Sequence, residues 1–294
     1  MREFTVYAPA KINLYLDVLR KRRDGYHDIE TLFEKIDLKD EIVVREAKKG
    51  IVVKVTPPVC PSGKGNIVYG ALEALFKEAG IVLGLDVTIK KNIPVSGGLG
   101  GGSSDAASVL RAVNEAFDLG VSKERLFSIA SAIGKDIPFF LLDTPFATGK
   151  GAGEIIEPVD VDYSLAHILI NPGIAVSTSE MYKRVDSFYR KRKKSSIEGI
   201  ISALKKKDII LLRESYYNIF EELLGAYRAS VEEAKHLLSE AGSGHGFLSG
   251  SGPSVFCILE HGAKAEEIFG RIPDRKNMRA YLATTYKGGI YGDN

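Results

Sequence analysis

A glycine-rich segment carries the strongest chemical signal in the chain. Five of the six residues from Gly97 to Gly102 are glycine, and two serines and an aspartate follow directly. Glycine adopts positive φ angles without steric penalty but costs about 0.5–1 kcal/mol where the backbone must be ordered, so this density indicates a backbone that curls closely around something. A strand-like run, Leu85–Ile89, precedes the segment, and a helical pattern that reaches Phe117 follows it. Because a helix N-terminus offers unpaired N–H groups and a positive dipole end, the segment is predicted to hold a phosphate.

The glycine segment departs from two common phosphate-binding patterns. The P-loop ends in Gly-Lys-Ser/Thr, whereas Gly102 is followed by Ser103 with no lysine. The dinucleotide pattern Gly-x-Gly-x-x-Gly also fails, because the register that starts at Gly98 and Gly100 has a serine where the third glycine is needed. A flexible linker is the alternative. The periodic flanking elements and the apolar Leu99 inside the segment argue against a linker.

Two other segments carry groups that could act on a phosphate or a hydroxyl. Lys11 and Asn13 are two residues apart in an apolar, strand-like run, which places their side chains on one face of a strand. An edge-strand lysine that discourages strand pairing is the alternative. Asp136 stands directly before the apolar run Ile137–Leu142, at the border of a core. A carboxylate that accepts local N–H groups in a turn is the alternative there.

Aromatic and polar side chains near position 26 could recognise a planar ring. Tyr26 and His27 follow Asp24-Gly25, Phe33 comes soon after, and Tyr182 lies far along the chain. Such side chains stack on a ring and hydrogen-bond to its edge. A hairpin turn with incidental aromatic residues is the alternative.

The composition is that of an ordinary globular protein. Hydrophobic residues make up 45% and charged residues 27% of the 294 residues, and the net charge of +2 argues against nucleic acid as a partner. The basic run Tyr189–Lys194 is interpreted as a solvated surface loop. Cys60 and Cys257 lack the spacing of metal ligands. With no signal peptide and no apolar stretch of about 18 residues, we expect a cytoplasmic protein with no membrane contact.

Strands and helices are expected along the whole chain without strict alternation, which predicts an α+β fold. Glu157–Asp160 is interpreted as a hinge, so we expect one domain over 1–158 and a second over 159–294. Asn66 and Ser122 are the predicted N-caps of two helices. The predicted helices span 66–79, 106–117, 123–133, 197–206, 209–224, 231–241 and 263–269. The predicted strands span 4–7, 12–18, 41–45, 51–55, 85–89, 166–170, 247–248, 254–260 and 278–285.

Four motifs, in this order, resemble the GHMP family of small-molecule kinases. They are Pro9-Ala-Lys-Ile-Asn13, Pro94 with Gly98-Leu-Gly-Gly-Gly-Ser-Ser-Asp-Ala-Ala107, Gly134-x-Asp-Ile-Pro-Phe139 and Leu248-Ser-Gly-Ser-Gly-Pro-Ser254. The resemblance covers nearly the whole chain and implies a two-domain GHMP kinase fold with the active site in the cleft between the domains. Asp24-Gly-Tyr-His27 narrows it to members whose acceptor is a methylerythritol linked to cytidine diphosphate.

The resemblance implies transfer of the γ-phosphoryl group of ATP to the 2-hydroxyl of that acceptor, a step of non-mevalonate isoprenoid synthesis. Asp136 would orient and deprotonate the hydroxyl, and Lys11 would stabilise negative charge. Mg²⁺ is expected with ATP because it bridges phosphate oxygens, but the sequence indicates no acidic ligand for it. The protein would be a monomer or a homodimer. The implied ATP-binding residues are Asn66, Lys91, Pro94, Gly97, Gly98, Leu99, Gly100, Gly101, Gly102, Ser103 and Ser104.

On the acceptor side, Tyr26 and Tyr182 would sandwich the cytosine ring, and His27 would read its polar edge. Two residues depart from the family pattern. Lys135 stands before Asp136 where a small residue is usual, and Tyr182 stands where phenylalanine is common. Lys135 is expected to point away from the site, because its neighbour Asp136 would point inward. The implied acceptor-binding residues are Asn13, Tyr26, His27, Phe33, Thr178, Tyr182, Gly250 and Gly252.

Overall fold

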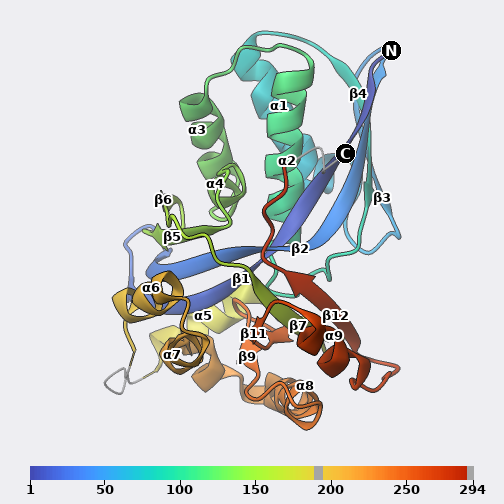
Figure 1. The fold of residues 1–294 in the computed structure, drawn as a ribbon. Helices are drawn as coiled ribbons and strands as arrows, with labels where there is room; N and C mark the ends of the chain where they lie inside the picture. The colour runs from blue at the N-terminus through green and yellow to red at the C-terminus, as the bar shows by residue number, and fades with distance from the viewer. Residues whose placement is uncertain (189–194, 290–294) are drawn as a thin grey trace.

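The computed structural model describes residues 1–188 and 195–289 (Figure 1), so the basic run Tyr189–Lys194 lies outside the described residues. The strands are β1 (Glu3–Lys21), β2 (His27–Ala47), β3 (Ile51–Thr56), β4 (Gly84–Lys90), β5 (Phe146–Lys150), β6 (Ile155–Pro158), β7 (Leu165–Asn171), β8 (Tyr217–Asn218), β9 (Phe247–Leu248), β10 (Val255–Phe256), β11 (Leu259–Glu260) and β12 (Arg279–Thr284). The helices are α1 (Ile67–Ala79), α2 (Gly101–Ala116), α3 (Lys123–Ile133), α4 (Ile137–Phe140), α5 (Thr178–Asp186), α6 (Ile197–Lys206), α7 (Ile209–Ser215), α8 (Arg228–Glu240) and α9 (Ala263–Gly270).

Two sheets organise the fold (Figure 1). The larger sheet has the strand order β3-β4-β2-β1-β8, and β5 and β6 extend it from β2. The smaller sheet has the order β11-β7-β10-β9, with β12 also paired to β7. The β3–β4 and β1–β8 pairs are parallel, whereas the β1–β2 hairpin is antiparallel. The predicted α+β class is confirmed, since helices and strands mix without a regular alternation.

One long strand, β1, runs through the middle of the molecule (Figure 1). The sequence predicts two short strands in this region, but the structure has a single one. Its register with β2 shifts between Pro9 and Ala10 and again after Asn13. A bulge accommodates a proline and re-aims nearby side chains. The strand therefore continues where the sequence pattern breaks, and Lys11 and Asn13 lie between the two bulges.

Hydrophobic packing forms three cores. The first lies where α1, α2 and α3 cover the larger sheet, and it buries Leu72 and Leu110 completely. The second lies between α5, α8 and the smaller sheet, and the third lies between the two sheets. Strand β1 contributes Val6 to the first core, Leu16 to the second and Ile12 to the third. The domain division at residue 158 stays a prediction.

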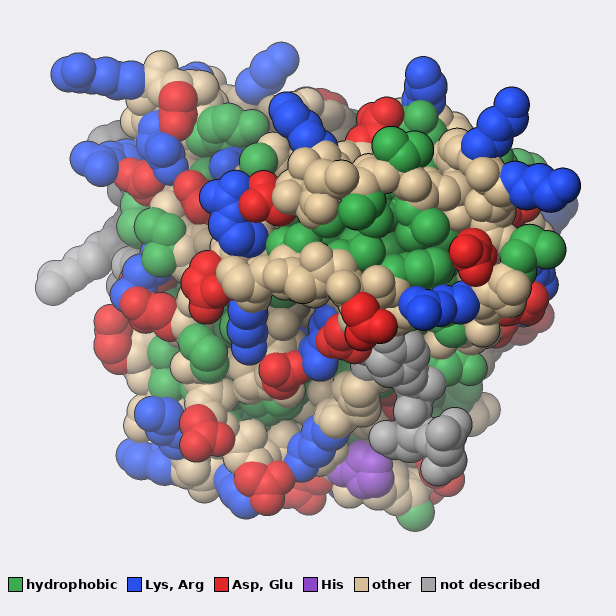
Figure 2. Space-filling model, turned by 90° about the horizontal axis from the view of Figure 1, so that it is seen from above, with side chains coloured by type: hydrophobic (Ala, Val, Ile, Leu, Met, Phe, Trp, Pro, Cys, Tyr) green, Lys and Arg blue, Asp and Glu red, His purple; other side chains and the backbone are tan. Residues whose placement is uncertain are grey.

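The surface over the α1–α3 end of the molecule is mixed in charge. Figure 2 shows Lys and Arg side chains interspersed with Asp and Glu on this face. Such mixing agrees with the small net charge and gives the face no extended field of one sign. Within residues 1–188 and 195–289, none of the helices has the length and apolar character needed to cross a membrane.

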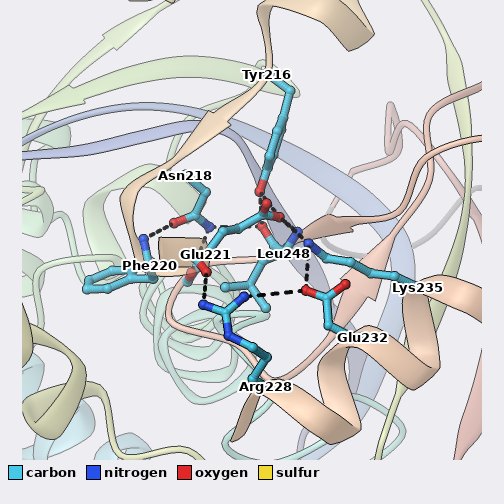
Figure 3. Close-up of polar contacts among 9 residues, drawn as sticks. Tyr216, Asn218, Phe220, Glu221, Arg228, Glu232, Lys235 and Leu248 are labelled. Carbon is cyan, nitrogen blue, oxygen red and sulfur yellow. Dashed lines mark hydrogen bonds and ion pairs between the residues drawn. The ribbon is translucent and has the colours of Figure 1, made fainter. Parts of the chain in front are cut away.

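The helix predicted over 209–224 is wrong. Helix α7 ends early, β8 follows it, and a 3₁₀ turn takes the place of the last part. The side-chain amide of Asn218 donates hydrogen bonds of 2.9 Å to the carbonyl oxygens of Leu248 and Gly250 (Figure 3). These tertiary hydrogen bonds require an extended backbone at Asn218, so they override the helical spacing of the apolar residues.

Other predicted elements agree with the structure more closely. Asn66 caps α1, where its Oδ1 accepts from the Val68 N–H at 3.0 Å, and Ser122 caps α3. Helix α6 has the predicted bounds. The strand predicted over 254–260 is divided into β10 and β11.

Candidate active site

A cavity of about 340 Å³ opens between the β1–β2 hairpin, the glycine segment, α4 and α5. The predicted site residues that line it are Lys11, Asn13, Phe33, Asn66, Lys91, Pro94, Gly97, Gly98, Leu99, Gly100, Gly101, Gly102, Ser103, Asp136, Thr178, Tyr182 and Gly250. Four predicted residues lie outside this lining: Tyr26, His27, Ser104 and Gly252. The fold thus brings most of the predicted donor-side and acceptor-side groups around one hollow.

Lys11 and Asp136 meet in this cavity, with Lys11 Nζ 3.8 Å from Asp136 Oδ2. Lys11 is only 4% exposed, which rules out the alternative of a solvated edge lysine. Its ammonium donates to Asn13 Oδ1 at 2.7 Å, as the shared strand face predicts. Burial lowers the pKa of Lys11, and the charge of Asp136 opposes that shift. The cation therefore lies between the Asn13 amide oxygen, which accepts its hydrogen bond, and the Asp136 carboxylate, which forms an ion pair with it.

The Asp136 carboxylate is not used by the turn in which it lies. Asp136 is the N-cap residue of α4, yet its side chain makes no capping hydrogen bond. Its side chain is 36% exposed and lines the cavity. The alternative of a carboxylate that accepts local N–H groups is therefore wrong. The group is placed to act on something in the cavity.

The glycine segment closes tightly on the loop before β10. Helix α2 begins at Gly101, so the residues up to Ser104 form its first turn rather than a loop. Gly98 has φ 75°, and a Cβ there would lie 2.2 Å from the carbonyl oxygen of Ser249. The Ser249 hydroxyl donates to the Gly98 carbonyl oxygen at 3.0 Å. The unpaired N–H groups of the first turn thus lie beside the cavity, as an anion site requires.

The second glycine motif, Leu248–Ser254, is fixed to both sides of the cavity. The Asn218 amide holds its Gly250 carbonyl oxygen, as described above. The hydroxyls of Ser251 and Thr178 are 3.0 Å apart, and both residues line the cavity. The loop therefore joins α5 to the glycine segment.

A buried ion cluster lies next to the first turn of α2. Lys91 Nζ is 2.8 Å from Asp105 Oδ2 and also contacts Asp40. Asp40 Oδ1 accepts from the backbone N–H groups of Asn92 and Ile93 at 2.6 and 2.9 Å. Burial raises the pKa of Asp105, and the charge of Lys91 opposes that shift. Lys91 lines the cavity, but its charge is already neutralised by two carboxylates, and the cluster fixes α2 to β2 and β4.

Aromatic rings form the opposite side of the cavity. Tyr182 lines it, and its ring centroid is 5.1 Å from those of His27 and Phe220. Burial raises the pKa of Tyr182. Tyr26 is 53% exposed, and Lys135 Nζ lies 5.3 Å from the centroid of its ring. Lys135 is thus directed to Tyr26, and His27 is the residue that contacts Tyr182.

Known proteins share this sequence nearly from end to end. The models of the GHMP kinases N terminal domain and the GHMP kinases C terminal domain match residues 66–144 and 189–277. A 4-diphosphocytidyl-2-C-methyl-D-erythritol kinase of Geobacter metallireducens is 38% identical over 271 residues, which cover 92% of this chain and 93% of the relative. That of Citrifermentans bemidjiense is 37% identical and covers 97% of this chain and 100% of its own. The chain belongs to the 4-diphosphocytidyl-2-C-methyl-D-erythritol kinase family of GHMP kinases.

Solved structures agree with this membership of the GHMP kinases. A crystal structure of 4-(cytidine 5'-diphospho)-2C-methyl-D-erythritol kinase is 32% identical, with a TM-score of 0.77 over 96% of this chain and 98% of that one. Homoserine kinase from Cytophaga hutchinsonii has a TM-score of 0.74 at 19% identity over 97% and 95% of the two chains, a likeness of fold alone.

Some cavity residues of this GHMP kinase were not expected from its sequence. Asp105, Cys60, Phe220 and Ser251 all line the cavity. Asp105 had a usable signal, because it is an acidic residue directly after a glycine–serine run at a helix start. Phe220 had none, since it fell within the wrongly predicted helix. Cys60 lies in an irregular segment whose sequence gives no periodic pattern.

Proposed function

We propose that this kinase transfers the γ-phosphoryl group of ATP to the 2-hydroxyl of 4-diphosphocytidyl-2-C-methyl-D-erythritol. One observation carries the proposal. The buried ammonium of Lys11, the Asp136 carboxylate that pairs with it but caps no helix, and the N-terminus of α2 line a single cavity. Phosphoryl transfer needs mainly alignment of the reactants and stabilisation of charge, and these groups supply both. The names of the relatives supply the acceptor.

Asp136 takes the proton of the acceptor hydroxyl and orients its oxygen toward the γ-phosphorus. A candidate base must be within hydrogen-bond reach of the proton it removes, and the carboxylate has no partner in its own turn. Lys11 stabilises the charge of the transferring group. Because Asn13 holds the ammonium from one side, the cation keeps its position while the charge on the phosphoryl oxygens changes.

The donor ATP lies with its phosphates against Gly98–Ser103, where the first-turn N–H groups of α2 are unpaired. Mg²⁺ accompanies ATP and would neutralise phosphate charge. The residues beside this turn fit such an ion, because Ser103 lines the cavity and both Ser104 Oγ and Asp105 Oδ1 are buried without a hydrogen-bond partner. Hydroxyl and carboxylate oxygens are the protein ligands that Mg²⁺ accepts. Asn66, the N-cap residue of α1, and Lys91 both line the cavity, and we place the adenosine beside them.

The acceptor occupies the side of the cavity near α5. Tyr182 provides a buried aromatic face, and His27 a polar ring edge beside it. Thr178 and Asn13 would contact the methylerythritol part, since both line the cavity, Thr178 on the same helix as Tyr182 and Asn13 beside Lys11. Tyr26 must come closer to Tyr182 to complete a sandwich, because its ring is exposed in this structure.

An acceptor panel with radiolabelled ATP tests the proposed function. The panel contains 4-diphosphocytidyl-2-C-methyl-D-erythritol, homoserine and mevalonate, with Mg²⁺ throughout. We expect label transfer to the cytidine compound alone. Transfer to homoserine or mevalonate instead would assign another acceptor to the same fold, and label transfer to none of the three would contradict the proposal.

A further inference from the structure

The tip of the β1–β2 hairpin is joined to the end of α5 by one carboxylate. His27 Nε2 is 2.7 Å from Asp186 Oδ1, and Lys21 Nζ contacts the other oxygen, Asp186 Oδ2. Lys21 and His27 are the last residue of β1 and the first of β2, whereas Asp186 is the last residue of α5. The contact therefore connects segments that are about 160 positions apart in the sequence, counted from His27 to Asp186.

The charge state of Asp186 determines which ring nitrogen of His27 carries hydrogen. A hydrogen bond from Lys21 and, to a smaller extent, one from His27 hold the pKa of Asp186 below its usual range. The group is therefore a carboxylate near neutral pH. A carboxylate only accepts hydrogen bonds, so the hydrogen between the two groups belongs to His27 Nε2. In a neutral imidazole the other nitrogen, Nδ1, then has a free lone pair.

Packing fixes the plane of the same ring. His27 is 8% exposed, and its ring lies 5.1 Å from that of Tyr182, at an interplanar angle of 33°. Tyr182 lines the active-site cavity. With one face against Tyr182 and Nε2 bound to Asp186, the ring has little freedom to turn. No hydrogen-bond partner for Nδ1 occurs among the residues that the structure describes.

We propose that Asp186 is a positioning residue that makes His27 selective for cytosine. It holds the imidazole as the Nε2–H tautomer, so that Nδ1 accepts a hydrogen bond from the exocyclic amine of the base. Uracil has a carbonyl oxygen at that position, which cannot donate. This inference rests on the proposed function, because it assumes that a cytidine group enters the cavity next to Tyr182.

Steady-state kinetics of Asp186→Ala and Asp186→Asn test the inference, with the cytidine acceptor and its uridine counterpart at saturating ATP. For Asp186→Ala we expect about a fivefold rise in KM for the cytidine acceptor, the loss of one hydrogen bond. The KM for the uridine compound should change by less than about twofold. The kcat should also change by less than about twofold, because Asp186 does not contact the reacting atoms. Asp186→Asn should restore most of the preference, since its amide oxygen can still accept from Nε2–H.

Glu180→Gln is the matched control. Glu180 is another acidic residue of α5, but it pairs with Arg184 and Tyr227 instead of the hairpin. Its variant should keep the ratio of kcat/KM between the cytidine and uridine acceptors. In Asp186→Ala, an unchanged ratio of kcat/KM between the two acceptors, with or without an equal loss of kcat/KM for both, would overturn the inference. Asp186 would then be a purely structural contact.

A second measurement separates this inference from the proposed function. Nitrogen NMR of histidine-labelled enzyme, with His27 assigned by its loss in His27→Gln, reports which ring nitrogen is protonated without any turnover. We expect a protonated Nε2 and an unprotonated Nδ1 at neutral pH in the wild type, and a mixture of tautomers in Asp186→Ala. The opposite tautomer in the wild type would refute the inference even in a fully active kinase.

Discussion

Glu34 of β2 and His167 of β7 meet inside the protein, with Oε1 and Nε2 3.1 Å apart and neither side chain exposed. His167 Nδ1 is 3.0 Å from the carbonyl oxygen of Cys257, so this nitrogen must carry a hydrogen. The Thr285 hydroxyl donates to the same Glu34 oxygen. A bare Nε2 facing a carboxylate would repel it, so the contact requires one proton between Glu34 and His167. The hydrogen bond that shares this proton connects the larger sheet, which contains Glu34, to the smaller sheet, which contains His167.

A double-mutant cycle measures this link. Glu34→Ala and His167→Ala should each lower the free energy of unfolding by about 3 kcal/mol, because each leaves a buried polar partner without its hydrogen bond. The double variant should lose much less than the sum of the two. Urea denaturation of the four proteins gives the coupling, and simple additivity would show that the two groups do not interact.

Removal of the Asp136 carboxylate should stop turnover without unfolding the protein. We expect Asp136→Asn to lower kcat by about 10²–10⁴-fold, the usual contribution of a general base. Asp143→Asn is the control, because Asp143 is an exposed carboxylate nearby that pairs with Arg111. Thermal unfolding should be similar for both variants. If Asp136→Asn kept more than about a tenth of kcat, Asp136 would not be the base.

Tyr26 should affect binding of the acceptor rather than catalysis. Tyr26→Ala removes an exposed ring and the cation–π contact with Lys135, so we expect a higher KM for the cytidine acceptor with kcat changed little. An aromatic contact of this kind is worth about 0.5–1.5 kcal/mol, or roughly 2–10-fold in KM. Tyr26→Phe keeps the ring and should behave like the wild type. An unchanged KM in the alanine variant would remove Tyr26 from the acceptor site.

Gly98 and Gly102 should respond oppositely to a methyl group. Gly98→Ala places a Cβ 2.2 Å from a backbone oxygen at φ 75°, so it should destabilise the fold by more than about 2 kcal/mol and raise the KM for ATP. Gly102 lies within α2, and its Cβ would be 3.7 Å from Ile67. Gly102→Ala should keep or raise stability, since alanine favours a helix by about 0.5–1 kcal/mol. Urea denaturation compares the two, and equal effects would contradict the close contact at Gly98.

Lys35 should make the stability of the protein depend on pH. Burial lowers its pKa from 10.5 to about 7, and its ammonium contacts the Leu142 carbonyl and lies 5.2 Å from the ring centroid of Phe139. Between about pH 7 and 10.5 the unfolded chain holds a proton that the folded chain lacks, so stability rises with pH in that window.

Comparison with Lys35→Met isolates this effect from the other groups that titrate there. The wild type should gain up to about 5 kcal/mol relative to the variant between pH 7 and pH 10.5. The gain should end above that range and be absent below it. Parallel pH curves for the two proteins would show that Lys35 keeps an ordinary pKa in the fold.

Much of the site could be predicted because its groups lie in short motifs with unusual residue types. The glycines around Gly98, and Lys11 and Asn13 at i and i+2, have local signals that do not depend on the rest of the fold. Their meeting in one cavity could not be derived from spacing alone, since Asp136 is more than a hundred positions from Lys11.

The failures have physical causes in contacts between distant segments. Asn218 is extended instead of helical because its side-chain amide donates hydrogen bonds to two carbonyl oxygens of the second glycine motif. Strand β1 continues through Pro9 because a bulge accommodates the ring. The ion pairs of Lys91 with Asp40 and Asp105 could not be predicted either, because neither carboxylate is adjacent to Lys91 in the sequence.

Because strand β1 contributes side chains to all three cores, it constrains the order in which the polypeptide can fold during synthesis. Domains that are independent can fold one after another as they leave the ribosome. Strand β1 cannot complete its packing in that order. Leu16 and Val18 pack with residues after position 160, whereas Val6 packs with segments before that position. A chain severed after Pro158 should therefore yield two insoluble pieces, which regain activity only when they are refolded together. The strand that carries Lys11 is translated before the elements it packs against and is enclosed only after they arrive.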